Sequence, residues 1–395
     1  MPDEERRARR ALACVMEAGN ARVAALVPKA GAEEVWRMLS ASARTAPTDA
    51  QDDPWVRRAA LLDLDAVEAA ERRGGMRFVI PGDAEWPARF ADLVSCPPVQ
   101  DMGGVPIGLW VRGSVPFADA VASSVAIVGS RASTPYGDRV ASGLAADLAS
   151  VGIAVVSGGA YGIDAAAHRG ALSEGGPTVA FLAGGVDEPY PRMNAGLLEE
   201  VALHGALVSE YPPGAHPTRP RFLARNRLIA AASEGTVMVE AAARSGARNT
   251  VTWAGGCFRP VMAVPGPIGN STSFTPHRLI RTGEAVLVTC ADEVRELIRP
   301  LGSVQEWRPS SERLLDTLTD QQRAAYEALP SRGVRDVGDL AVRSGLRMPE
   351  CLAALDVLAT IGLAVRHNDG RWGLGKVGDR PMLPFETTAR AAELP

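Results

Sequence analysis

The middle of the chain alternates short apolar runs with stretches of helical spacing. Seven runs rich in Val, Ile and Ala lie between residues 121 and 298: Val125–Val128, Ile153–Val156, Thr178–Leu182, Ala206–Val208, Thr236–Val239, Val261–Val264 and Ala285–Val288. Continuous apolar strands that alternate with helices are typical of a parallel sheet covered on both faces. The pattern therefore predicts an α/β fold for this region.

Glycine or serine directly follows several of these runs. The positions are Gly129-Ser130, Ser157-Gly158-Gly159, Ala183-Gly184-Gly185 and Pro265-Gly266. In open α/β sheets, ligands bind at the carboxyl ends of the strands. We therefore expect the ligand site to be built from these loops.

The flanking segments have other patterns. Residues 1–72 contain short apolar stripes at helical spacing, broken at Gly19-Asn20 and at 28–31, and predict a small helical module. The main domain spans 73–300, with its core at 121–298. Its first part, residues 75–118, is interrupted by prolines, and we expect it to pack on that core. After a linker at 301–311, residues 312–376 follow the order of a winged helix, namely helix, helix–turn–helix and hairpin. Residues 377–395 form a tail.

Composition narrows the class of protein. The 395 residues carry a formal net charge of −4, and 46% hydrophobic with 22% charged residues is a globular balance. Only Lys29 and Lys376 are lysines, so an anion site here would use planar guanidinium groups. The charged N-terminus and the lack of a long apolar stretch argue against export and against the membrane. Five widely spaced cysteines predict reduced thiols in a cytoplasmic protein, with no metal site.

The loop at Gly129-Ser130-Arg131 is the first candidate site. A strand ends there and a helix follows from about Gly137, which gives an anion site at a helix N-terminus with Arg131 as its charged anchor. The segment is not a GxGxxG motif, so dinucleotide binding is a weak alternative. A purely structural glycine turn is another alternative.

The loop at 157–168 contains three glycines after a strand, followed by Asp164 and His168 four residues apart on one helix face. Such a pair could be metal ligands or an acid–base pair, but no third ligand or nucleophile is suitably spaced. We therefore interpret Asp164 and His168 as a structural pair that fixes the loop.

The segment from Ala215 to Arg281 is strongly basic. It holds nine arginines against two acids, although the whole chain is acidic. Within it, residues 219–227 place four arginines, Asn226 and Phe222 around the entry to a helix. Cations beside an exposed aromatic ring suit a nucleic-acid strand. A solvated basic face, internal pairing with Glu210 and Glu240, and a small phosphorylated ligand are the alternatives.

Taken together, the motifs resemble the DprA/Smf family of DNA-processing proteins. They are Val-Gly-Ser-Arg (128–131), the segment 157–168, Asp-Glu-Pro-Tyr-Pro (187–191), Ser-Glu-Tyr-Pro-Pro-Gly (209–214), Arg-Asn-Arg-Leu-Ile-Ala (225–230), Glu-Ala…Ser-Gly (240–246) and Val-Pro-Gly (264–266). The resemblance implies an extended Rossmann-like domain that binds single-stranded DNA without sequence preference. It also implies a homodimer, protection of DNA during natural transformation, delivery of the strand to the recombinase RecA, and no cofactor or catalytic activity.

The resemblance also implies a set of site residues. Those expected at the DNA are Gly129, Ser130, Arg131, Ser157, Gly158, Gly159, Arg192, Arg221, Phe222, Arg225, Asn226, Arg227 and Arg248, and those expected to shape the pocket are Asp164, His168, Glu210 and Glu240. Arg131 would contact phosphate, the glycine loop would offer backbone N–H groups, and residues 225–227 would face them. The chain departs from the family at Leu223, where proline is common, and at Arg248, an added cation.

The flanking units fit the same family, whose members often carry a sterile-alpha-motif or helix–hairpin–helix module and a winged helix. The would-be recognition helix, Met348–Ile361, contains Glu350 and Asp356 but no Lys or Arg. A helix that enters the major groove should be basic. We therefore expect this helix to bind protein or to pack on the core.

Two other kinds of function stay open. One is a nucleotide-hydrolysing enzyme of the lysine-decarboxylase-like Rossmann group, since Gly235-Thr236 and Glu240 match part of that group's loop, although the preceding glycines are missing. The other is a nucleotide-sensing interaction module.

Overall fold

The computed structural model describes residues 3–45, 53–299, 318–330 and 333–375. The chain divides into two compact units, Met1–Glu306 and Trp307–Pro395. The predicted linker, the predicted tail and residues 312–317 lie outside the described residues.

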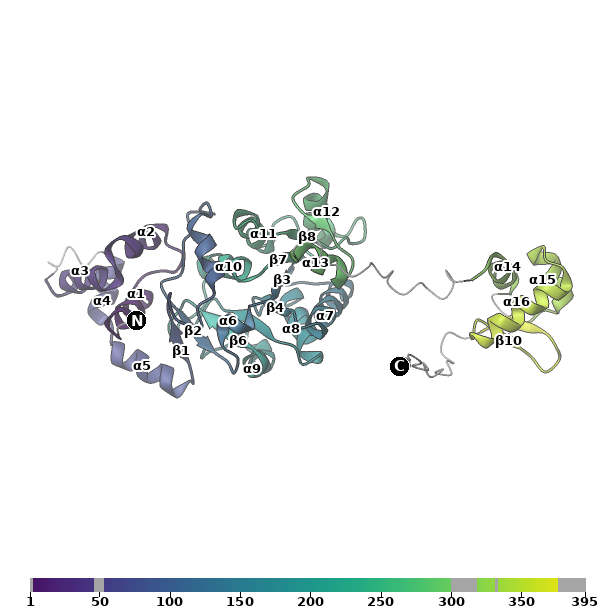
Figure 1. The fold of residues 1–395 in the computed structure, drawn as a ribbon, viewed down its shortest axis with the longest axis horizontal. Coiled ribbons are helices and arrows are strands. Elements are labelled where there is room, and N and C mark those ends of the chain that lie inside the picture. Colours follow the sequence, from purple (N-terminus) through teal and green to yellow (C-terminus); the bar gives the residue numbers. More distant parts are fainter. Residues whose placement is uncertain (1–2, 46–52, 300–317, 331–332, 376–395) are drawn as a thin grey trace, which may run out of the picture. The chain divides into compact units, whose positions relative to one another are not determined.

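A nine-stranded sheet forms the centre of the first unit (Figure 1). Seven of its strands run parallel in the order β6-β5-β4-β3-β7-β8-β9. They are β3 (Ser124–Val128), β4 (Ala154–Ser157), β5 (Thr178–Phe181), β6 (Ala206–Ser209), β7 (Gly235–Met238), β8 (Val261–Ala263) and β9 (Val286–Leu287). Each overlaps one of the seven apolar runs, so the predicted α/β class with a mostly parallel sheet is confirmed.

Two further strands, β1 (Arg77–Val79) and β2 (Leu109–Arg112), extend the sheet beyond β6. β2 pairs antiparallel with β6, and β1 pairs antiparallel with β2. The sequence predicts only that this segment packs on the core. Strands of three and four residues between prolines are too short to show an alternating pattern, which explains the omission.

Helices cover both faces of the sheet. On one face, α7, α8 and α13 pack on strand residues such as Val125, Ile127 and Val237. On the other face, α10 and α11 pack on the alternate positions, such as Ala126 and Met238. Because successive strand side chains point to opposite faces, burial on both sides requires the continuous apolar runs seen in the sequence.

The sheet domain contains longer helices and four short ones, η2, α6, η3 and η4, of 7, 4, 3 and 3 residues. In chain order they are η2 (Ala88–Val94), α6 (Phe117–Ala120), α7 (Pro135–Ser150), α8 (Ile163–Ser173), η3 (Arg192–Asn194), α9 (Ala195–His204), α10 (Arg219–Ala232), α11 (Ala247–Gly256), η4 (Ser271–Ser273), α12 (Phe274–Arg281) and α13 (Ala291–Ile298).

The order of the strands reverses between β3 and β7. From β3 the chain adds β4, β5 and β6 on one side, and it then returns to add β7, β8 and β9 on the other side. At such a switch point the connections leave neighbouring strands in opposite directions, and α/β proteins bind ligands there. The loops after β3 and β7 therefore mark the expected site.

Among its described residues, the second unit contains three helices and a hairpin. They are α14 (Asp320–Ala328), α15 (Val337–Ser344), α16 (Met348–Thr360), β10 (Ala364–Arg366) and β11 (Trp372–Leu374). Gly345, in the left-handed region at φ 70°, ends α15, and Leu340, Leu355 and Trp372 are buried in a separate small core. The elements follow the predicted order, and the winged-helix assignment stays a prediction.

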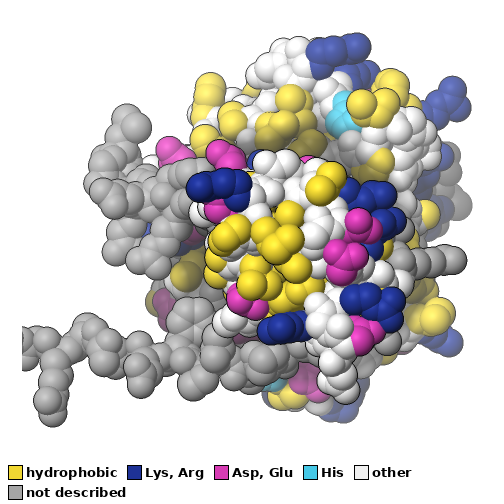
Figure 2. Space-filling view, turned by 90° about the vertical axis from the view of Figure 1, so that its right-hand side faces the viewer, with side chains coloured by type: hydrophobic (Ala, Val, Ile, Leu, Met, Phe, Trp, Pro, Cys, Tyr) yellow, Lys and Arg dark blue, Asp and Glu magenta, His cyan; other side chains and the backbone are white. Residues whose placement is uncertain are grey.

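The second unit exposes apolar side chains. Hydrophobic side chains gather on the face turned toward the viewer in Figure 2, with basic and acidic side chains around them. Within this unit, Val342, Met348, Leu352 and Val357 are among the exposed large apolar residues, and the last three lie on α16. α16 contains no Lys or Arg, and whether it reads duplex DNA stays a prediction from sequence.

In the described parts of residues 1–76, five helices precede the sheet: α1 (Asp3–Val15), α2 (Ala21–Ala30), α3 (Ala32–Thr45), α4 (Pro54–Leu61) and α5 (Leu64–Arg73). We refer to residues 1–72 as the N-terminal module. The predicted break at 28–31 falls at the last of these residues, because α2 continues through Pro28 to Ala30 and Gly31, whose φ is 79°, caps it. A residue with a positive φ cannot continue a right-handed helix, so the helix ends at Gly31 and not at the proline.

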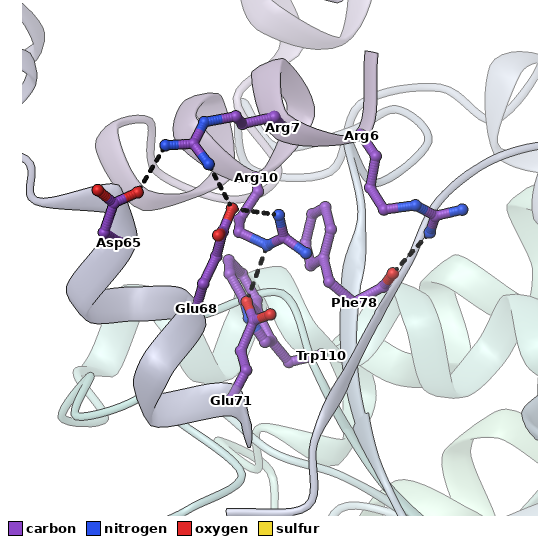
Figure 3. A network of polar contacts seen from close by, with 8 residues as sticks. All are labelled: Arg6, Arg7, Arg10, Asp65, Glu68, Glu71, Phe78 and Trp110. Carbon is purple, nitrogen blue, oxygen red and sulfur yellow. Dashed lines mark hydrogen bonds and ion pairs between the residues drawn. The ribbon is translucent and has the colours of Figure 1, made fainter. Parts of the chain in front are cut away.

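The N-terminal module is bonded to the β1–β2 edge of the sheet (Figure 3). Arg10 of α1 pairs with Glu68 and Glu71 of α5 at 2.9 Å and 3.0 Å. Glu71 also accepts a hydrogen bond from the Trp110 indole N–H at 2.7 Å. Arg10 lies over the Phe78 ring, 5.2 Å from its centroid. Charge and ring contacts thus join α1, α5 and both edge strands.

Candidate functional site

The loop after β3 presents Arg131 to solvent. The backbone at Gly129 passes so close to Ile163 that an added Cβ would lie 2.6 Å from its Cγ1. Ser130 donates its backbone N–H to the carbonyl oxygen of Glu240 at 2.6 Å. The loop is therefore fixed on both sides, whereas Arg131 is exposed and forms no ion pair with any described residue.

Glu240 follows β7, and its hydrogen bonds hold the loop after β3 in place. It is 1% exposed, and its carboxylate accepts hydrogen bonds from the backbone N–H and the hydroxyl of Thr134 at 2.8 Å and 2.6 Å. Thr134 in turn caps α7 by accepting the N–H of Gly137. A Cβ at Gly137 would lie 2.3 Å from Glu240 Oε2, so this position requires glycine. Glu240 joins the two loops at the switch point.

Aromatic rings lie beside Arg131. Its guanidinium carbon is 4.4 Å from the centroid of the Phe222 ring, and the Phe222 and Tyr190 rings are 6.1 Å apart. Tyr190 is 48% exposed, and Tyr161, in the loop after β4, is 42% exposed. The sequence analysis assigns no role to either tyrosine. A tyrosine in a glycine- and proline-rich loop at a strand end was the signal that could have identified both.

We use the name strand-end surface for five residues at these strand ends: Arg131, Tyr161, Tyr190, Arg192 and Phe222. Phe222, in the first turn of α10, is half-buried, and the other four are exposed. Arg192 is exposed at the start of η3 and forms no ion pair with any described residue. Unpaired cations and rings with free faces can bind phosphate and stack on bases. The strand-end surface can thus hold an extended polyanion that carries aromatic groups.

The loop after β4 is held from within. The Asp164 carboxylate accepts the backbone N–H groups of Gly158 and Ala160 at 3.2 Å and 3.3 Å. The Ser157 hydroxyl donates to the carbonyl oxygen of Ile127 at 2.7 Å. Ser157, Gly158 and Gly159 are all buried, so the N–H that the sequence analysis expects Gly158 to offer to phosphate is already bonded to Asp164.

Arg225 lies beneath this loop. Its Nη1 donates to the carbonyl oxygens of Gly158 at 2.7 Å and Phe181 at 2.5 Å. Burial lowers the pKa of Arg225 to about 10, and the charge of Asp164 opposes that effect. Burial also raises the pKa of Asp164, while the charge of Arg225 acts to lower it. The hydrogen bonds of Arg225 to Gly158 and Phe181 fix α10 to the loop after β4 and to β5.

His168 belongs to the same buried cluster. Its Nδ1 lies 2.7 Å from the Thr178 hydroxyl, which itself donates to the carbonyl oxygen of Val155 at 2.8 Å. Because that hydroxyl proton is used, Nδ1 must carry the proton that bonds His168 to Thr178. Burial, followed by the charge of Arg225, lowers the pKa of His168 to about 3. The ring is neutral and bonds to Thr178 of β5, so His168 has a structural role but does not form the predicted pair with Asp164.

Arg227 and Asn226 are also turned inward. Arg227 is about 1% exposed and pairs through both Nη atoms with Glu210, while its Nε donates to the carbonyl oxygen of Gly104 at 3.0 Å. The Asn226 amide donates to the side chain of Asn249 at 3.3 Å. Arg227 is thus paired internally with Glu210, which was one of the alternatives considered from the sequence.

The two remaining predicted cations are ion-paired. Arg221 bonds to Glu17 of the N-terminal module through Nε and Nη2, both at 3.2 Å, and lies over the Tyr211 ring at 4.5 Å. Arg248 pairs with Glu284. Arg131 and Arg192 therefore differ from the other predicted arginines in being both exposed and unpaired among the described residues.

Among the described residues, no group of three His, Cys, Asp or Glu side chains is placed to hold a metal ion. A search of the same residues finds no helix with the length and apolar character to cross a membrane.

The doubly wound sheet and the cationic, aromatic surface at its switch point define a Rossmann-like nucleic-acid- or nucleotide-binding class of α/β protein. The chain belongs to the DNA recombination-mediator protein A family, whose family model matches residues 77–299.

Individual relatives agree with this assignment. The chain is 46% identical over 316 residues to the DNA processing protein DprA of Mycobacterium tuberculosis, covering 80% of each chain. It is 39% identical over 244 residues to the protein Smf of Escherichia coli, covering 60% of this chain and 64% of Smf. The crystal structure of DprA from Streptococcus pneumoniae superposes with a TM-score of 0.60 at 27% identity, over 74% of this chain and 97% of that one. The family predicted from the motifs is confirmed.

Proposed function

We propose that this protein binds single-stranded DNA without sequence preference at the strand-end surface. The observation that carries the proposal is the exposed Arg131, which forms no ion pair among the described residues and stacks on Phe222 at the switch point of the sheet. Phosphates would bond to Arg131 and Arg192, while bases would stack on Phe222 and Tyr190. Such binding uses the backbone charge and the ring faces that every base has, so it does not depend on sequence.

The buried residues would act through these exposed ones. Glu240 fixes the loop that carries Arg131. Arg225 and Asp164 fix the loop after β4, and Arg227 with Glu210 fixes α10, which carries Phe222. In this proposal the loop residues Ser157, Gly158 and Gly159 shape the site and do not bond to phosphate. All three are buried, and the Gly158 N–H already donates to Asp164.

The wider role follows the family. We propose that the protein acts in the cytoplasm as a homodimer formed through its Rossmann-like domain, protects single strands during transformation and recombination, and loads RecA onto them without a catalytic step of its own. Light scattering tests the dimer, and the rate at which RecA displaces a single-strand-binding protein from DNA tests the loading.

The first test is fluorescence anisotropy of a labelled oligo-dT across a salt series. Wild-type protein should bind with a strong salt dependence. Arg131→Gln should weaken binding at low salt and flatten the log–log salt slope by about 0.7, the value for one phosphate contact on a single strand. Phe222→Leu should weaken binding by about 1–3 kcal/mol, the range for one base–aromatic stack, and leave the slope unchanged.

Arg169→Gln is the matched control, because Arg169 is an exposed arginine of α8 that lies outside the strand-end surface. It removes the same charge, so a slope change equal to that of Arg131→Gln would argue for diffuse attraction instead of a site. Absence of oligo-dT binding by folded wild-type protein at low salt would refute the proposal. Release of ribose from a nucleoside monophosphate would then favour the nucleotide-hydrolase alternative.

A further inference from the structure

Glu17 connects the N-terminal module to the helix that carries Phe222. Glu17 follows α1, and its carboxylate accepts hydrogen bonds from Arg221 Nε and Nη2, both at 3.2 Å. The same carboxylate pairs with Arg58 of α4 at 3.0 Å. The third nitrogen of the Arg221 guanidinium donates to the carbonyl oxygen of His216 at 3.0 Å. All three nitrogens of this guanidinium therefore already have acceptors.

Arg221 lies at the start of α10, next to the residue on which bases are proposed to stack. It precedes Phe222 in the first turn of α10, and the Phe222 ring carries Arg131. Arg221 also lies over the Tyr211 ring, so its side chain is held flat against the protein. A strand that stacks on Phe222 would bring a phosphate beside an arginine whose charge is already neutralised by Glu17.

The turn that carries Glu17 is packed firmly against α10. Gly19, with φ 74°, lies where a Cβ would be 3.3 Å from the Cβ of Ala224. Gly103 donates its N–H to the Gly19 carbonyl oxygen at 2.8 Å. A cavity of only about 20 Å³ separates this turn from the buried Arg227–Glu210 pair. Glu17 is thus held in place by the backbone around it as well as by its own ion pairs.

Glu17 is ionised at neutral pH. Burial by itself would raise the pKa of Glu17, but the hydrogen bond and charge of Arg221, together with Arg58, bring it below its ordinary value. A carboxylate and a phosphodiester are both oxyanions that bond to guanidinium in the same way. They therefore compete for Arg221.

We propose that Glu17 is a positioning residue that withholds Arg221 from the phosphate backbone, so that the N-terminal module limits the affinity of the strand-end surface for single-stranded DNA. This inference rests on the proposed function. Release of Arg221 from Glu17 adds one phosphate contact to the site, and DNA bound at high concentration exchanges one oxyanion for another on the same guanidinium.

The test is a double-mutant cycle in the full chain with Glu17→Gln, Arg221→Gln and the combined variant, each measured against oligo-dT across a salt series. Glu17→Gln keeps the size of the side chain and should tighten binding about fivefold at low salt, an effect at the upper end for one exposed ion pair. It should also steepen the salt slope by about 0.7. Arg221→Gln alone should change little, and it should abolish the gain when combined with Glu17→Gln.

Asp83→Asn is the charge-matched control. Asp83 pairs with Arg6 at 2.7 Å, so this variant also removes one negative charge and one ion pair between the module and the sheet domain, but away from α10. Its salt slope should match that of the wild type. A thermal melt of each variant checks that the module stays folded.

Two results would overturn this inference and leave the proposed function intact. One is an equal gain from Glu17→Gln and Asp83→Asn, which would reflect net charge. The other is an additive cycle, in which Arg221→Gln weakens binding by the same factor with or without Glu17. Failure of every variant and of the wild type to bind oligo-dT would overturn the proposed function and this inference with it.

Discussion

Arg225 and Arg131 show how one residue type serves two purposes at this site. Arg225 is buried and bonds to two backbone carbonyl groups, whereas Arg131 is exposed and stacks on a ring. A buried guanidinium is stabilised only when its donors are paired, so it is a structural cross-link more readily than a ligand contact. Substitution of Arg225 should therefore affect folding first, and substitution of Arg131 should affect binding alone.

Gly158→Ala tests this division. An added Cβ would lie 2.2 Å from Arg225 Nη1, so the guanidinium must move and its carbonyl bonds must break. We expect a loss of about 1–3 kcal/mol in the free energy of unfolding, the usual cost of overpacking, and weaker binding to oligo-dT. Urea denaturation measures the first effect and anisotropy the second.

Gly143→Ala is the control for that variant. Gly143 lies within α7, and a Cβ there meets nothing within 4 Å. Alanine should stabilise the helix by up to about 1 kcal/mol and leave DNA binding unchanged. Equal stabilities for the two variants would contradict the packing role assigned to Gly158.

His168 makes the fold sensitive to acid. Burial, followed by the charge of Arg225, lowers its folded-state pKa from 6.5 to about 3. At pH values between 3 and 6.5, His168 is protonated in the unfolded chain but neutral in the folded protein. The free energy of unfolding therefore falls as the pH drops below 6.5. The contribution reaches about 1.4 kcal/mol per pH unit. His168→Leu cannot titrate, so urea denaturation at pH 7, 6 and 5 should show its stability rising relative to wild type. A pH-independent difference would contradict this account.

Among the elements, those buried on both faces were the most predictable. The seven parallel strands follow from their apolar runs, since a strand covered on both faces cannot tolerate polar positions. The edge strands β1 and β2 were not predicted, because three or four residues cannot display a period. The family motifs named the loops of the candidate site, but a motif does not show which way its side chains face.

Helix α10 is the clearest case of that limit. Its residues 224–232 are all buried, so no polar face marks the side of the helix that meets a ligand. A helix with charged residues in its sequence normally turns them to solvent, and here tertiary pairing overrides that expectation. The sequence could therefore single out Arg225, Asn226 and Arg227 as candidates, but it could not predict that their side chains are buried.

Across the whole molecule, the basic segment is less basic than its sequence indicates. Four of its nine arginines, Arg221, Arg227, Arg248 and Arg259, pair with Glu17, Glu210, Glu284 and Asp92. All four acids lie outside residues 215–281, so a count within the segment could not include them. The segment therefore offers less free positive charge than its sequence suggests. The proposed binding depends instead on unpaired cations such as Arg131, which lies outside the segment, so Arg131→Gln is an informative substitution.

The division of the chain gives a last prediction. The strand-end surface lies entirely within Met1–Glu306, which has its own cores, whereas the second unit exposes an apolar helix without cations. Deletion of residues 307–395 should therefore leave the oligo-dT affinity within about twofold and the salt slope unchanged, since no phosphate contact is removed. Anisotropy with oligo-dT and with a duplex of equal length measures both. A duplex affinity that disappears on deletion would show that the second unit reads duplex DNA, against the expectation from its sequence and its exposed side chains.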